Sequence, residues 1–184
     1  KLHLEGLPLD ADLSWDVLIG LVAGGRAGAV EIDAQLAKDA TASGQRRASH
    51  AKAALPSAEA KRAAWNALVN AGQPGAPEKA MPNALQFEAT LGFNHVNDWE
   101  LLVPFVDDYF ASLRRIYSDK SNEMATNLIE GLYPVQLAGW MPELPAKAEA
   151  WLAENEDAHD ALKRLVREGA DGVRRALANQ AADE

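Results

Sequence analysis

The sequence predicts an all-α protein built from consecutive short antiparallel helices. No stretch beyond the first few residues alternates apolar and polar side chains for long enough to form a strand. Apolar side chains recur instead with helical spacing along the rest of the chain. Candidate helix starts return at nearly even intervals, at Ser14, Gly28, Ser43 and Ser57. Short helices of this kind stack into a solenoid or an irregular helical array.

The amino-acid totals fit a folded domain and argue against two classes of partner. Of the 184 residues, 48% are apolar and 24% are charged, which is ordinary for a globular protein. The formal net charge of -9 disfavours nucleic acid, because such binding depends on Lys and Arg neutralising phosphates. No apolar run is long enough to span a bilayer, so we expect no membrane partner. The chain shows no secretory signal and no cysteine, and we expect a cytoplasmic location.

The N-terminal part of the chain is expected to begin with a linker and two helices. Residues 1–11 read as an extended segment or linker. Asp12 or Ser14 is expected to cap the first helix, since either side chain can accept hydrogen bonds from free N–H groups. The glycine pair at 24–25 can end that helix in a left-handed turn. A second helix is expected to start near Gly28.

The stretch 39–65 predicts two helices packed back on each other around a proline. Thr41 or Ser43 is expected to cap the first helix. Pro56 ends it, because proline has no N–H to donate and disfavours helix in the preceding residue. Ser57 then caps the second helix. A stripe with helical spacing is expected to face the first helix and consists of Ala60, Ala63, Ala64, Ala67, Leu68 and Ala71.

Residues 72–82 (GQPGAPEKAMP) contain three prolines and two glycines and are expected to lack regular structure. We read them as an internal loop of a single helical domain over 1–184, with a domain boundary as the other possibility. HEAT and armadillo proteins are examples of such helical arrays, although the period alone assigns no named repeat class.

The C-terminal half predicts further helices separated by prolines. A short helix is expected over 83–93. Asn97 and Glu100 resemble a capping box that opens a long apolar stripe, which Pro104 either kinks or divides into two helices. Later helices are expected from Ser121, around Trp151, and from Asp157 toward Gln180, with 133–145 mostly in turns.

The chain contains no recognisable catalytic or metal-binding motif. None of the four histidines, His3, His50, His95 and His159, lies in a His-Glu-x-x-His arrangement, and none pairs with another at helical spacing. No cysteine nucleophile and no phosphate-binding glycine loop is present. We therefore predict no catalytic residue and no metal ligand within this chain. The acidic group Glu154, Glu156, Asp157 and Asp160 is expected to favour a helix N-terminus rather than a metal.

One basic cluster gives a candidate binding surface. Arg46, Arg47 and His50, with Lys52 beside them, lie close together in an otherwise acidic chain. The cluster is either a solvated helix face or a contact for a carboxylate such as a peptide C-terminus, because Arg binds carboxylates bidentately. An aromatic set is expected to be core, with a peptide groove as the alternative: Trp99, Phe105, Tyr109, Phe110 and Tyr117.

Several segments resemble the C-terminal helical domain of the aminopeptidase N family of zinc metallopeptidases. The actinobacterial type is the most similar, and the endoplasmic-reticulum aminopeptidases are more distantly so. The matching segments, in chain order, are GLPLDADLSWDVLIGLVAGG, EIDAQLAKDATASGQRRASHAKAALPSAEAKRAAW, ELLVPFVDDYFASLRRIY and ALKRLVREGADGVRRALANQAAD. Their residues are packing residues, so they mark the fold more specifically than the function.

The resemblance implies a non-catalytic domain of a larger zinc aminopeptidase. The family's zinc and exopeptidase motifs lie upstream in the full protein, and none is present here. The implied role is a helical bowl that closes over the catalytic domain of the same polypeptide and controls access of peptide substrates to it. Loop 72–82 departs from the shorter connection expected for the family. The alternative function is a stand-alone helical-repeat scaffold that binds a protein or peptide.

Overall fold

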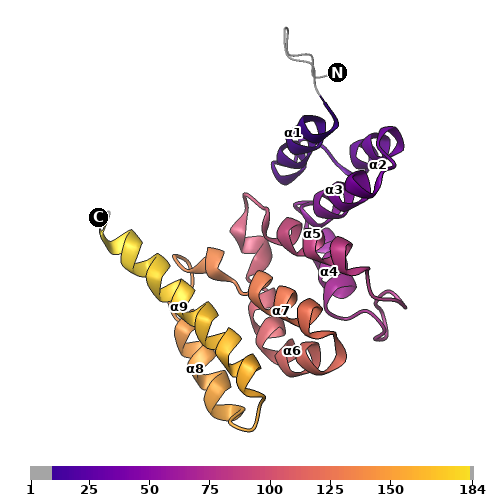
Figure 1. Cartoon of the computed structure of the whole chain (residues 1–184). Coiled ribbons are helices and arrows are strands. Elements are labelled where there is room, and N and C mark those ends of the chain that lie inside the picture. Colours follow the sequence, from indigo (N-terminus) through magenta and orange to yellow (C-terminus); the bar gives the residue numbers. More distant parts are fainter. Residues whose placement is uncertain (1–9, 183–184) are drawn as a thin grey trace.

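The computed structural model describes residues 10–182, and every regular element in that range is a helix (Figure 1). The predicted all-α class is confirmed, and the arrangement is compatible with a helical repeat. The described helices are α1 (Ala11–Ala23), α2 (Ala29–Lys38), α3 (Ala42–Ala53), α4 (Ala58–Leu68), α5 (Asn83–Asn94), the 3-10 helix η1 (Trp99–Leu102), α6 (Phe105–Asp119), α7 (Asn122–Gly131), the 3-10 helix η2 (Val135–Leu137), α8 (Leu144–Glu154) and α9 (Asp160–Ala182). The predicted linker at 1–11 falls almost entirely outside the described residues.

Local capping chemistry sets many of the helix ends as predicted. The side chains of Thr41, Ser57 and Ser121 each accept a hydrogen bond from a backbone N–H three residues further on, at 3.1, 3.2 and 3.4 Å. Gly25 follows α1 with φ of 68°, the left-handed conformation that glycine adopts without a steric penalty. Pro56 lies between α3 and α4. These ends depend on residues within one helical turn.

Two predicted N-caps were wrong by one or a few positions. Asp10, rather than Asp12 or Ser14, caps α1 and accepts from the Leu13 N–H at 2.8 Å. Asp98, rather than Asn97, caps η1. In both cases a neighbouring acidic side chain has the extended backbone that a cap requires, and the predicted residues do not occupy that position.

Prolines mark the start of two helices in the C-terminal half. Of the two alternatives predicted at Pro104, the separation into two helices is confirmed, since η1 ends at Leu102 and α6 begins at Phe105. Pro145 lies in the first turn of α8, where its missing N–H costs no hydrogen bond, so the expected turn region ends earlier than 145. The last helix begins at Asp160, not at Asp157.

The main partner of α3 is α5 rather than α4, which corrects the predicted central pair. The two helices lie very close together at Gly92 of α5, where an added Cβ would overlap the backbone of His50 on α3. The contact between α3 and α4 is smaller. Only a residue without a side chain allows this approach, and Gly92 lies 42 positions beyond His50.

The alanine stripe of α4 does not form its buried face. The side chains that α4 buries are Lys61, Trp65 and Leu68, each at most 2% exposed. Apart from Leu68, the predicted stripe is half-buried or exposed, and a shallow apolar groove of about 380 Å³ is lined by residues of α3, Met81 and four alanines of the stripe, Ala60, Ala63, Ala64 and Ala67. Alanine side chains fit either a close helix contact or an open surface. The face of α4 that carries the larger side chains Lys61, Trp65 and Leu68 is therefore the one that is buried.

The buried apolar residues form two clusters. The smaller one joins α1, α2 and α3 around Trp15, Ile32 and Ala51. The larger one extends from the end of α3 to α9. In Figure 1, α1–α3 lie at one end of the molecule, and α8 packs along α9 at the other. Within the larger cluster Phe105, Tyr109 and Phe110 are buried, which confirms the core interpretation for these three, while Trp99 and Tyr117 are partly buried and pack against the cluster.

Candidate functional site

The basic cluster predicted as a binding surface lies on α3, and the structure pairs most of it with carboxylates. Arg47 Nη1 lies 3.0 Å from Asp16 Oδ1 of α1. His50 Nδ1 lies 3.4 Å from Glu88 Oε2 of α5. Lys52, next to the three predicted residues, lies 2.9 Å from a carboxylate of α2. These pairs cross between helices, so much of the positive charge is balanced within the molecule.

Arg46 is the member of the cluster that remains available at the surface. Its side chain is exposed, and no described carboxylate lies within ion-pair distance of it. It borders a hollow of about 460 Å³ between α3, α5 and α7. Phe87 in this hollow is 46% exposed, and the amide oxygen of Asn83 is buried without a hydrogen-bond partner among the described residues. The remaining lining residues are Ala84, Glu88, Glu123 and Asn127.

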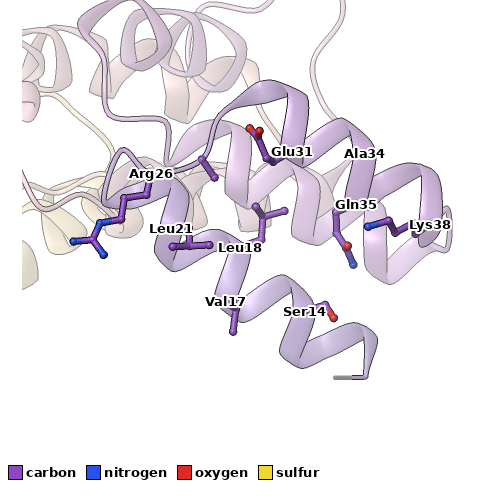
Figure 2. A pocket seen from close by; sticks show the side chains of 10 residues that line it. Ser14, Val17, Leu18, Leu21, Arg26, Glu31, Ala34, Gln35 and Lys38 are labelled. Atoms are coloured by element: carbon purple, nitrogen blue, oxygen red, sulfur yellow. The ribbon is translucent and has the colours of Figure 1, made fainter. Parts of the chain in front are cut away.

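A second hollow of about 400 Å³ runs between α1 and α2 (Figure 2). Both helices pack on α3, which leaves an open groove between them. Figure 2 shows Arg26 and Lys38 at opposite ends of this groove, with the apolar side chains of Leu18 and Leu21 between them. An apolar floor with cationic ends is a surface on which an extended peptide could lie. No local sequence pattern predicts this groove, because its walls come from two different helices.

Two histidines that are far apart in the sequence meet beside the basic cluster. His50 Nε2 lies 3.2 Å from His95 Nδ1, and the two rings are edge to face. The pKa of His50 is lowered, chiefly by burial, while Glu88 opposes this shift. His95 is the first residue after α5, 45 positions from His50. A search for histidines at helical spacing could not find this pair, because only the packing of α3 on α5 brings them together.

Lys61 is a buried cation that the sequence analysis missed. Its ammonium donates hydrogen bonds to the carbonyl of Ala53, the last residue of α3, at 2.6 Å, and to that of Phe93 near the end of α5, at 2.8 Å. It therefore caps two helix C-termini, where a positive charge is favourable. Burial lowers the pKa of Lys61 to about 7. A signal was available: Lys61 shares helical spacing with the buried Trp65 and Leu68.

Within residues 10–182, no three or more His, Asp or Glu side chains are grouped so that they could hold a metal ion. Two members of the acidic group near α9 pair with cations, Asp157 with Arg114 and Asp160 with Lys163, and Asp160 lies in the first turn of α9 as expected. None of the described helices has the length and apolarity to cross a membrane. The candidate site within the described residues therefore consists of surface hollows and the side chains that line them.

The described residues define an all-helical domain with surface grooves, and sequence comparisons identify the family. The family described as ERAP1-like C-terminal domain matches residues 1–175. Aminopeptidase N of Streptomyces lividans is 39% identical over 181 residues, covering 98% of this chain. The chain belongs to the ERAP1-like C-terminal domain family. It spans about a fifth of that relative's length and corresponds to its C-terminal part.

Proposed function

We propose that this chain is the C-terminal, non-catalytic helical domain of a zinc-dependent aminopeptidase. The observation that carries the proposal is the alignment of 98% of the chain with the C-terminal part of an aminopeptidase N. The parent enzyme would remove N-terminal residues from peptides with a zinc-activated water. This chain has no His-Glu-x-x-His segment, so the ligands of that zinc would lie upstream. Peptide catabolism and a cytoplasmic location belong to the same proposal.

In this proposal the domain closes over the catalytic cavity of the same polypeptide and controls which peptides enter. Arg46 would bind the carboxylate of a peptide, and the exposed ring of Phe87 beside it would contact an apolar side chain. Arg47 and His50, the other predicted contact residues, would hold the α3 surface in place through Asp16 and Glu88. The groove between α1 and α2 offers a second place for the distal part of a long peptide.

Removal of this chain from the full-length aminopeptidase is expected to change how hydrolysis depends on peptide length. The measurement is kcat/KM for peptides of increasing length and for a short aminoacyl chromogenic substrate. The ratio between long and short substrates should change, because the access-controlling surface is gone. Adding the separate 184-residue chain should restore part of the original profile. An unchanged length profile would contradict the access role and favour a stand-alone scaffold that binds a protein or peptide.

Arg46→Ala in the full-length enzyme is expected to raise KM for peptides with a free C-terminal carboxylate by about 5-fold, the effect of one partly exposed charge-assisted hydrogen bond. The same peptides with an amidated C-terminus should show little change. Arg164→Ala is the matched control, since Arg164 is an exposed arginine of α9 whose described ion pair, to Glu168 at 3.8 Å, stays within its own helix. Equal effects of both variants, or of both peptide series, would refute the Arg46 contact.

A further inference from the structure

The His50–His95 pair lies at the close contact of α3 with α5 around Gly92. His50 lies on α3 directly over Gly92 of α5, and His95 follows three residues after Gly92. The two imidazoles are therefore attached to backbone segments that cannot separate without opening this contact. His50 is half-buried, with 14% of its side chain exposed, whereas His95 is exposed to solvent. The pair is preorganised and can be reached from outside.

Glu88 determines how the proton of His50 is placed. Its Oε2 lies 3.4 Å from His50 Nδ1, so a proton on Nδ1 points toward a carboxylate. The Nε2 lone pair of neutral His50 then faces His95 Nδ1. A metal-binding histidine commonly donates its second ring N–H to a carboxylate in this way, which fixes its tautomer and orientation. The other charged group acting on His50 is Arg47, which is paired with Asp16.

The separation of the two facing nitrogens fits a shared metal ion. Zinc–nitrogen bonds of about 2.0–2.1 Å at a tetrahedral angle place two ligand nitrogens about 3.3 Å apart. The observed separation is 3.2 Å. We propose that His50 and His95 form a binding site for a divalent transition metal ion such as Zn²⁺, Ni²⁺ or Cu²⁺, with Glu88 as the positioning residue of His50. Imidazole nitrogen is a preferred ligand of all three ions.

The described residues supply two ligands and no third, so solvent completes the coordination sphere. On binding, the proton of neutral His95 moves through solvent from Nδ1 to Nε2 of the same ring, and the ion takes its place between the two facing nitrogens. Small rotations of the imidazoles about their side-chain bonds direct both lone pairs at the ion. The remaining coordination positions are filled by water, since His95 is exposed to solvent.

The test is a calorimetric titration of the chelator-treated 184-residue chain with ZnCl₂, NiCl₂ and CuCl₂. One ion per chain should bind, and the ring nitrogens of His50 and His95 should shift together in ¹H–¹⁵N spectra. His95→Gln is the primary variant because His95 is exposed, and it should weaken binding at least tenfold. Glu88→Gln should weaken binding about tenfold, because His50 loses the carboxylate that orients its ring and fixes its tautomer. Circular dichroism checks that each variant keeps its helical content.

His159→Gln is the matched control, because His159 lies beside Tyr117 at α9 and away from the pair. It should bind the ions as the unaltered chain does. The proposal is overturned if the unaltered chain shows no saturable binding of one ion. It is equally overturned if the His50→Gln/His95→Gln double variant binds as tightly, since the ion would then lie elsewhere. Neither result bears on the proposed aminopeptidase role.

Discussion

Replacing Gly92 with alanine is expected to lower the free energy of unfolding by about 2–3 kcal/mol. The new methyl group would overlap the carbonyl of His50, which is backbone and cannot rotate away. The helices α3 and α5 would have to move apart along their whole contact. That movement loosens both the His50–His95 pair and the Lys61 hydrogen bonds. Urea denaturation of the two proteins at neutral pH measures the difference.

Gly20→Ala controls for the general effect of adding a methyl group to a helical glycine. Gly20 lies within α1, and a Cβ there meets no atom within 4 Å. This variant should be stabilised by up to about 1 kcal/mol, the ordinary preference of helices for alanine over glycine. If Gly92→Ala were as stable as Gly20→Ala, the close approach of α3 and α5 would be wrong.

The stability contributed by Lys61 is expected to rise steeply with pH. The pKa of Lys61 is about 7 in the folded protein and 10.5 for an ordinary lysine. Between these values the unfolded chain binds more protons at this residue than the folded chain does. Unfolding therefore becomes harder as pH rises, by about 1.4 kcal/mol per pH unit at most. Well below pH 7, Lys61 is charged in both the folded and the unfolded protein, so it does not make the free energy of unfolding depend on pH.

The measurement compares the free energy of unfolding of the unaltered protein and Lys61→Met at pH 6, 8 and 9.5. Methionine keeps a similar length and removes the titrating group, so the other groups cancel in the difference. That difference should shift in favour of the unaltered protein as pH rises from 7 toward 9.5. Lys79→Met, at an exposed lysine of the connection between α4 and α5, should show no comparable trend. A flat difference would mean that the two carbonyls keep Lys61 charged when folded.

The sequence by itself predicted where most helices begin and end. Ser57 and Ser121 cap their helices, and Pro56 separates α3 from α4, because each acts on backbone groups within a few residues. The near misses at Asp10 and Asp98 have the same origin, since several adjacent polar side chains could serve as the cap. The segments that resemble the aminopeptidase N C-terminal domain also identified the family correctly.

Only the tertiary structure decided which helix faces meet. Local spacing could not show that α3 pairs with α5 instead of α4, because the choice depends on Gly92 fitting against His50. The alanine stripe of α4 looked like an interface, but Lys61 and Trp65 bury more surface and took the inner position.

The candidate site was predicted only in part for the same reason. Arg46 could be found from the basic cluster, but the exposed Phe87 beside it comes from another helix. The predicted contact residue Arg47 is paired with Asp16 across a helix boundary. His50 and His95 are 45 positions apart in the sequence, and only helix packing brings their rings together, so no local sequence pattern predicts the pair. Helix caps and turns depend on residues that are close together in the sequence, so they can be predicted from it. A site built from several helices depends instead on packing among residues far apart in the chain.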